Sequence, residues 1–297
     1  MIRRTFFALS LLLFALASCQ NAEDNTVKAA DILKKLAKGE TVVYSGKKIT
    51  GVLDFTKAGR AKAVHLNLAR TRIAGGVTFH ECTFEDSVIA FRQDPLGGYA
   101  TSFGQNLSFL KCQLKQGLDL SSSQVGGDFN FVESICYGPL KVNTALLEGK
   151  RNSLSYSKFI GKVQINNSLV IGDLRVMEAE FRDKLSARRS DFRGDLVFGR
   201  CLFPQGADMT ANRFRDRFRL VFGQMGNQTT LQHSVFGGEV DISGTKSDSL
   251  FVLSHNTFNA LPVQKNLETK IFQSENNKLL IYTPLDSLIQ PVKTIPQ

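Results

Sequence analysis

Two histidines stand at a spacing that could hold a metal ion. His233 and His255 are 22 residues apart, so they occupy the same position of successive units if the chain repeats with that period. Imidazole nitrogens bind zinc, but zinc sites take three or four protein ligands, and no third ligand follows this spacing. The two histidines are therefore a weak candidate for a metal pair, and we expect no cofactor.

Four cysteines in the body of the chain offer a second chemistry: Cys82, Cys112, Cys136 and Cys201. None belongs to a CxxC or Cys/His cluster of the kind that binds zinc. Cys112 and Cys201 fall in the same column of the repeat described below, but roughly 19 Å apart, which no disulfide spans. Cys82 and Cys112 stack if the segment between them completes a coil, and small buried thiols are the simpler interpretation.

Charges of both signs recur every eleven residues between residues 173 and 203. If 22 residues separate stacked positions, opposite charges form rungs between neighbouring units, each contributing about 0.2–1 kcal/mol. The stacked pairs are Glu178 with Arg200, Asp191 with Arg213, and Asp195 with Arg217. Arg193 and Arg215 instead bring two like charges together, and we predict this pair as a possible anion-binding site.

The elements that position these residues come from an internal repeat. Fourteen units begin between Leu107 and Phe251, and twelve of the thirteen intervals between them are eleven residues long. Position 3 of every unit is apolar, position 8 is apolar in all but one unit, and position 6 is always small or Asn. Such a regular period indicates a solenoid, in which each unit buries its apolar face only by stacking on its neighbours.

The repeat favours strands over helices. An eleven-residue period is also that of a right-handed coiled coil, but positions 1 and 3 would lie roughly 200° apart around a helix. On a strand the same two positions face one side. Glycines near the unit boundaries, such as Gly161, Gly172 and Gly194, also disfavour a helix.

On a strand, positions 1 and 3 and positions 6 and 8 form two pairs of inward-facing residues in each unit. These pairs resemble those of the pentapeptide-repeat family, in which a small residue stands two places before a central Leu or Phe. The stretches AEF, SDF, NRF and CTF carry the resemblance, although alternate centres have a large residue at the small place and the period is eleven rather than ten. The resemblance implies an all-β, right-handed, quadrilateral parallel β-helix of about 22 residues per coil. About nine coils stacked roughly 4.8 Å apart make a rod on the order of 40 Å long.

The ends of the chain differ from the repeat. Residues 26–38 have apolar residues at helical spacing, followed by Gly39, which predicts a helix that caps the first coil. We predict a signal peptide over 1–18, a tether over 19–27, a cap of helix plus strand over 28–48, a solenoid over 49–259 with an excursion near 91–106, and a C-terminal cap or tail over 260–297.

The first twenty residues predict the cellular location of the protein. Arg3 and Arg4 precede an apolar stretch, residues 5–17, that is too short for a membrane-spanning helix. The sequence Leu16-Ala17-Ser18-Cys19 then resembles the lipobox of bacterial lipoproteins, which implies cleavage before Cys19 and anchoring to membrane lipid through its acylated residue. An ordinary secretory signal is the alternative.

Two further resemblances indicate which membrane the protein is anchored to. Gln20 rather than Asp follows the cysteine, which in bacterial lipoproteins favours the outer membrane. Glu23-Asp24 resembles the export signal of some Bacteroidota surface lipoproteins. We therefore expect an outer-membrane lipoprotein that faces the periplasm or the cell surface.

Composition narrows the possible partners. The net charge is +10 and Trp is absent. Some pentapeptide-repeat proteins mimic DNA, which requires an acidic surface in the cytoplasm, so neither mimicry nor nucleic-acid binding fits an exported basic chain. A basic cluster over residues 28–62 could lie on anionic headgroups, and a solvated face is the alternative.

The function that fits these features is a non-enzymatic binding or structural scaffold, with an envelope protein or polysaccharide as partner. No GxSxG, HExxH or P-loop motif is present, and we name no catalytic residue. A β-helical polysaccharide lyase or hydrolase at the cell surface is the alternative, although such enzymes build their clefts from long loops and aromatic subsites.

Overall fold

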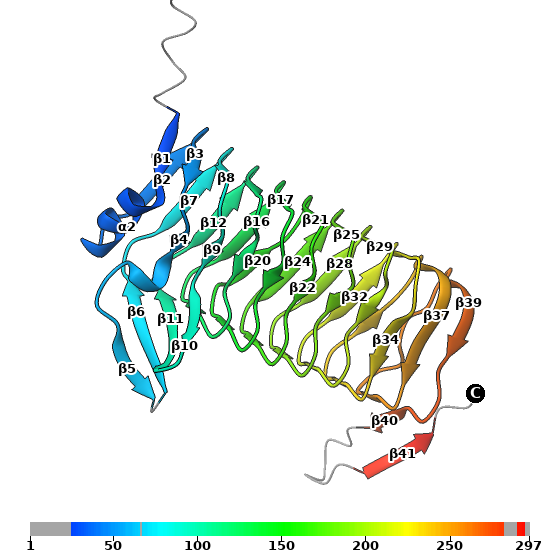
Figure 1. Ribbon diagram of the computed structural model, residues 1–297. Coiled ribbons are helices and arrows are strands. Elements are labelled where there is room, and N and C mark those ends of the chain that lie inside the picture. Colours follow the sequence, from blue (N-terminus) through cyan, green and yellow to red (C-terminus); the bar gives the residue numbers. More distant parts are fainter. Residues whose placement is uncertain (1–24, 66, 282–289, 295–297) are drawn as a thin grey trace, which may run out of the picture.

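The chain winds as a right-handed parallel β-solenoid of about 22 residues per coil (Figure 1). This computed structural model describes residues 25–281 apart from residue 66, together with residues 290–294. A regular coil has four short strands, and we number the faces of the rod 1 to 4 in the order in which the chain visits them. The predicted all-β fold is therefore confirmed.

Each face is a ladder of parallel strands from successive coils. Face 1 is a nine-stranded sheet, faces 2 and 3 join through β37 and β39 into a 19-stranded sheet, and face 4 forms most of a 13-stranded sheet. Face 1 consists of β2 (Val42–Ser45), β7 (Val77–His80), β12 (Leu107–Leu110), β16 (Phe129–Val132), β20 (Arg151–Ser153), β24 (Asp173–Met177), β28 (Leu196–Gly199), β32 (Phe218–Val221) and β36 (Val240–Asp241).

Faces 2 and 3 have mostly two-residue strands. Face 2 consists of β1 (Thr26–Lys28), β3 (Lys48–Thr50), β8 (Thr83–Phe84), β13 (Gln113–Leu114), β17 (Ile135–Cys136), β21 (Lys158–Phe159), β25 (Glu180–Phe181), β29 (Leu202–Phe203), β33 (Gln224–Met225), β37 (Lys246–Ser254) and β39 (Glu268–Gln273). Face 3 consists of β4 (Leu53–Asp54), β9 (Val88–Ile89), β14 (Leu118–Asp119), β18 (Leu140–Lys141), β22 (Val163–Gln164), β26 (Leu185–Ser186), β30 (Ala207–Asp208) and β34 (Thr229–Gln232).

The sheet of face 4 also includes strands that leave the rod. Its members are β5 (Lys62–His65), β6 (Leu68–Ile73), β10 (Phe91–Asp94), β11 (Gly97–Phe103), β15 (Gln124–Val125), β19 (Leu146–Leu147), β23 (Leu169–Val170), β27 (Asp191–Phe192), β31 (Arg213–Phe214), β35 (Val235–Phe236), β38 (Thr257–Phe258), β40 (Lys278–Ile281) and β41 (Gln290–Thr294).

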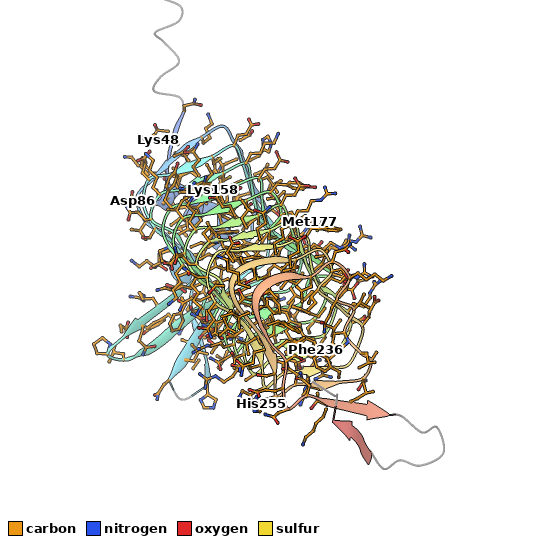
Figure 2. The ribbon with its side chains drawn as sticks, turned by 90° about the vertical axis from the view of Figure 1, so that its right-hand side faces the viewer. Lys48, Asp86, Lys158, Met177, Phe236 and His255 are labelled. Atoms are coloured by element: carbon orange, nitrogen blue, oxygen red, sulfur yellow. The ribbon has the colours of Figure 1, made fainter. Side chains whose placement is uncertain are left out.

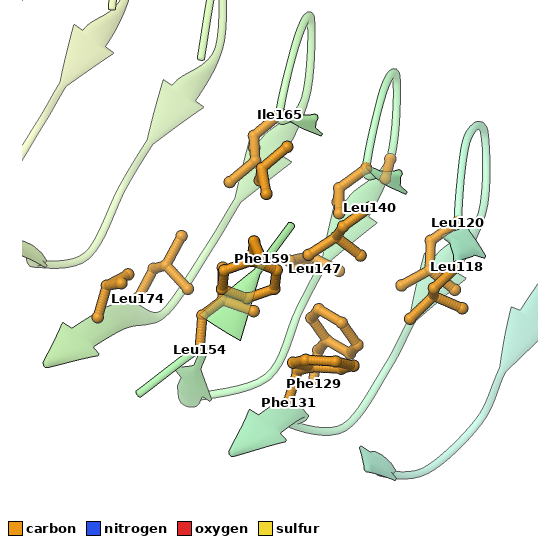
Figure 3. Packing of buried hydrophobic residues seen from close by; sticks show 14 of the residues in the cluster. Leu118, Leu120, Phe129, Phe131, Leu140, Leu147, Leu154, Phe159, Ile165 and Leu174 are labelled. Carbon is orange, nitrogen blue, oxygen red and sulfur yellow. The ribbon is translucent and has the colours of Figure 1, made fainter. Parts of the chain in front are cut away.

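The repeat positions point where the sequence predicts. In the register of β12 and β16, Leu107 pairs with Phe129 and Phe109 with Phe131, 22 residues apart, and all four side chains are buried. Figure 3 shows apolar residues of successive coils packed together inside the rod. The rings of position 8 stack along face 2, with 5.0 Å between the centroids of Phe159 and Phe181. Each such pair adds about 0.5–1.5 kcal/mol to the gain from burial.

The small residues of position 6 connect the coils by buried hydrogen bonds. Ser134 Oγ accepts from the backbone N–H of Cys112 one coil below, at 2.8 Å, and donates to the carbonyl of Val132, at 2.9 Å. Asn212 does the same with its amide, accepting from the N–H of Ser190 and donating to the carbonyl of Ala187. A polar atom at this position therefore satisfies backbone groups at a corner that has no regular ladder.

Position 5, next to the small position, turns two of the four corners. Sixteen non-glycine residues in the described part of the chain have positive φ, including Lys111, Ser122, Glu133 and Thr144 at intervals of eleven. They lie at the corner between faces 1 and 2 and at the corner between faces 3 and 4. Such a residue costs roughly 1–2 kcal/mol relative to the right-handed conformation, which the stacked strands on either side offset.

A helix caps the N-terminal end, as predicted, but it is shorter than the predicted span. Helix α2 covers Ala29–Ala37 and buries Ala29, Ile32 and Leu36 against the first coil. Residues 26–28, predicted as helix, form strand β1 instead, because their backbone pairs with β3 from Thr26–Lys48 to Lys28–Thr50. The strand predicted as part of the cap, β2, pairs with β7 and so belongs to the first coil.

The predicted excursion is a β-hairpin, and a second excursion precedes it. Strand β10 pairs antiparallel with β11, β11 pairs parallel with β6, and β6 pairs with β5. Leu107 pairs with Val77 thirty residues earlier, eight more than a regular coil, and Val77 pairs with Val42 after 35 residues. Both insertions leave the rod at the corner between faces 3 and 4, and the hairpins project together below it (Figure 1).

The coils also continue past the point where the repeat fades. The sequence repeat ends near Phe258, but β39 pairs with β37, and β40 pairs with β38. Strand β41 then pairs antiparallel with β40 and projects from the same long edge as the hairpins (Figure 1). Residues 260–281 therefore extend the solenoid, whereas β41 projects from it.

Candidate functional site

The charges that could do chemistry are mostly rungs between coils. Arg200 Nη1 lies 3.3 Å from Glu178 Oε1, and Arg217 Nη2 lies 2.5 Å from Asp195 Oδ2. Asp191 and Arg213 are backbone partners in β27 and β31, as their spacing predicts, but their side chains do not pair. The carboxylate of Asp191 is instead bound by Arg215.

Asp191 explains the pair of like charges. Its carboxylate accepts from Arg215 Nε and Nη2, at 3.0 and 2.7 Å, and lies 3.6 Å from Arg193 Nε. Burial alone would raise the pKa of Asp191, but the two guanidinium groups outweigh it and hold this pKa below its usual value. Arg193 and Arg215, predicted as an anion site, therefore already share an internal anion.

A cleft beside this triad contains the arginines that Asp191 leaves unpaired. It has a volume of about 310 Å³ and lies over Ala211, between Arg189, Arg213 and His233. Ala211 occupies the left-handed corner position between Arg189 and His233, 22 residues from each, and its methyl group leaves a notch there. Within the described residues, the guanidinium groups of Arg189 and Arg213 have no ion pair or hydrogen bond.

The two histidines of the metal candidate stack at that same corner. The ring centroids of His233 and His255 are 5.0 Å apart. His255 Nδ1 is 3.2 Å from Ser254 Oγ, and its Nε2 is 3.2 Å from Asn276 Nδ2, so both of its nitrogens have polar neighbours. Residues 25–281, with residue 66 excluded, contain no group of three His, Cys, Asp or Glu side chains that could hold a metal ion. Figure 2 places His255 near the end of the rod where β40 and β41 lie.

The four described cysteines are free and buried. Because the hairpin completes its coil, Gln113 pairs with Thr83, and the adjacent Cys112 stacks on Cys82. A hydrogen bond from the Cys112 thiol lowers the pKa of Cys82 to about 7, while the same pairing raises the pKa of Cys112. Burial raises the pKa of Cys136 and of Cys201 to about 12, so these two are inert packing residues.

The predicted lipidation residue, Cys19, lies outside the described residues, as does the rest of the lipobox. No helix in the described part of the chain is both long and apolar enough to cross a membrane.

Comparison with known proteins leaves the family open. No protein-family model matches the chain, and no solved structure matches it. A segment of 98 residues, 33% of this chain, is 34% identical to the arginine–tRNA ligase of Pseudoalteromonas translucida (strain TAC 125). The match spans 16% of that ligase, so the ligase's activity gives no basis for assigning one here. The fold itself defines the class: a quadrilateral β-solenoid, compatible with a pentapeptide-repeat-like β-helix.

The cleft at Ala211 is the feature that the sequence did not reveal. The 22-residue spacing placed Arg193 one coil below Arg215 and Asp191 one coil below Arg213, but it could not show which arginine would bind the carboxylate of Asp191. Ala211 itself is an ordinary residue in the sequence. What marks the cleft is the position of this small residue between two long corner side chains. That position can be recognised only once the left-handed corner is known.

Proposed function

We propose that the protein is a lipid-anchored, non-enzymatic scaffold of the bacterial cell envelope. The observation that carries the scaffold part is the uninterrupted stack of inward columns from β2 to β40, which ties every coil to the next by ladder bonds, rings and buried position-6 hydrogen bonds. A closely packed stack of this kind is rigid along its axis, as a spacer or binding platform needs to be.

The non-enzymatic part draws support from how the carboxylates are used. Glu178, Asp191 and Asp195 each bind an arginine of an adjacent coil. Carboxylates in that arrangement stabilise the stack, whereas a general acid or base needs a free group facing a substrate. The anchoring part has its support in the lipobox-like Leu16-Ala17-Ser18-Cys19.

Cell fractionation tests the anchor. Wild-type protein should be found in the membrane fraction, and Cys19→Ala or treatment with globomycin should release it or block its processing. A substitution of buried Cys201, Cys201→Ala, is the matched control and should leave fractionation unchanged. A membrane pool that is the same with and without Cys19 would contradict the proposal.

A further inference from the structure

We infer that the cleft over Ala211, lined by Arg189, Arg213 and His233, binds the acidic groups of a polyanionic polysaccharide. The inference deepens the proposed binding scaffold, on which it rests for its location outside the cytoplasm. The observation behind it is separate from those that support the scaffold: two arginines without partners line one cleft of about 310 Å³.

The local charge favours an anion. Arg189 and Arg213 line the cleft together with Asp191. Arg193 and Arg215 lie in the same two coils, and the carboxylate of Asp191 is the described ion-pair partner of both. That carboxylate is occupied by Arg193 and Arg215, so the two remaining guanidinium groups keep their full donor capacity. A guanidinium presents several N–H donors in a plane that matches a carboxylate or sulfate.

The cleft is a built feature rather than an ordinary stretch of surface. The backbone and amide of Asn212 are held by Ser190, Ser234 and Ala187, which fixes the floor of the notch. Arg189 and His233 stand two coils apart on one corner, about 10 Å along the rod, with Arg213 beside them on face 4. Arg189, Arg213 and His233 therefore all border the same cleft.

The openness of the site indicates a chain-like ligand. Exposed ion pairs contribute little individually, so a single free anion in this cleft binds weakly. A polymer that carries an acidic group on successive units gains from several weak contacts at once, and Arg193 and Arg215 continue the basic surface beside the cleft. The residues that line the cleft include no aromatic ring other than His233, and single-stranded nucleic acids are usually held on aromatic platforms.

Binding of a sulfated oligosaccharide to the full-length chain, measured by calorimetry at low and at high salt, tests the inference. Inorganic sulfate and phosphatidylglycerol vesicles serve as the other two probes. The double variant Arg189→Ala/Arg213→Ala should weaken oligosaccharide binding at least tenfold. Ala211→Glu, which fills the notch with a like charge to the ligand, should do the same. Arg151→Ala, which removes an exposed arginine on face 1, is the matched control and should change binding less than about threefold.

Each result decides the question. An equal loss in the Arg151→Ala control would show that only net charge matters and would overturn the cleft. The polysaccharide ligand would be excluded if the protein bound none of the three probes. It would also be excluded if the cleft variants weakened binding of sulfate or of vesicles but not of the oligosaccharide. Circular dichroism spectra and melting temperatures of all variants separate misfolding from lost binding. Fractionation of the same variants keeps the two proposals apart, because the cleft substitutions leave anchoring intact whereas Cys19→Ala removes it.

Discussion

At the scale of single residues, the position-6 side chain carries more of the structure than its size suggests. Ser134 is buried, accepts from the N–H of Cys112 and donates to a carbonyl of its own coil. Two coils above, Ala179 holds the same place without a polar atom. The column therefore contains one residue whose side chain makes hydrogen bonds and one whose side chain cannot, and each can be substituted by the other type.

Ser134→Ala should lower the free energy of unfolding by about 1–3 kcal/mol, because the buried N–H of Cys112 loses its acceptor. Ala179→Ser is the matched reverse change. Its hydroxyl oxygen can accept from the backbone N–H of Ser157 one coil below, as Ser157 Oγ accepts from the N–H of Ser134, so the change should leave stability unchanged or raise it. Urea unfolding of both variants checks the pair, and the expectation fails if the two changes have the same sign and size.

The ion pair of Asp208 makes part of the stability depend on pH. Burial would raise the pKa of Asp208, but hydrogen bonds from Arg188 Nε and Thr210 Oγ1, both at 2.7 Å, hold this pKa below its usual value. Because the folded state then binds protons less readily than the unfolded state, the contribution is present above about pH 4. It disappears as the pH falls through the lower pKa of the folded state.

Asp208→Asn should therefore cost about 1–2 kcal/mol at pH 7 and should flatten the fall of the melting temperature between pH 5 and pH 2. Asp31→Asn is the control, because the ion pair of Asp31 with Lys34 lies on the exposed face of helix α2. A series of thermal melts across this pH range measures both variants. The same acid slope in Asp208→Asn and in the wild type would refute the assignment.

At the scale of elements, the sequence revealed the strands better than the corners. Apolar residues at positions 1, 3 and 8 mark the inward side because their side chains must be buried. The left-handed residue at position 5 carries no such mark, since Lys111, Glu133 and Arg200 occupy it although Gly and Asn suit it better. The first insertion stayed hidden because Leu66, Leu68 and Ile73 stand at the spacing of positions 1, 3 and 8 of a repeat unit, although β5 is exposed throughout.

The β10–β11 hairpin is an insertion that can be removed without disturbing the register. Deletion of residues 92–99 shortens its coil from 30 to 22 residues, so that Ala100 takes the corner position, Thr101 the small position and Phe103 the inward position. The free energy of unfolding should change by no more than about 2 kcal/mol, since a shorter connection costs less entropy to close. Deletion of residues 119–126, also eight residues long but within a regular coil, should prevent native folding. Circular dichroism and urea unfolding compare the two, and equal damage by both would contradict the insertion.

At the scale of the whole molecule, stability comes from contacts between neighbouring coils. Away from the two insertions, the parallel ladders join residues about 22 positions apart, as in the pairing of Leu174 with Leu196. The ends of the rod are the least regular parts: none of residues 259–276, which include β39, is buried, so their sequence need not keep the apolar pattern. This is why the repeat fades near Phe258 although the coils continue.

The unit of the architecture is the 22-residue coil, not the eleven-residue repeat, and deletions can tell them apart. Removal of residues 163–184 places Leu185 over Leu140, Phe203 over Phe159 and Gly194 over Gly149, so each column continues with a residue of its own kind. Glycine matters in the last of these columns, because a Cβ at Gly172 would meet the carbonyl oxygen of Gly149 at 2.2 Å. Removal of residues 163–173 turns all later coils by half a turn and stacks face 1 on face 3.

Since a repeat protein loses roughly the energy of the unit removed plus any mismatched interface, the 22-residue deletion should lower the melting temperature by about 5 °C or less. The eleven-residue deletion should lower it by more than about 10 °C. Thermal melts followed by circular dichroism measure both, and equal melting temperatures would mean that the half-coil is the interchangeable unit.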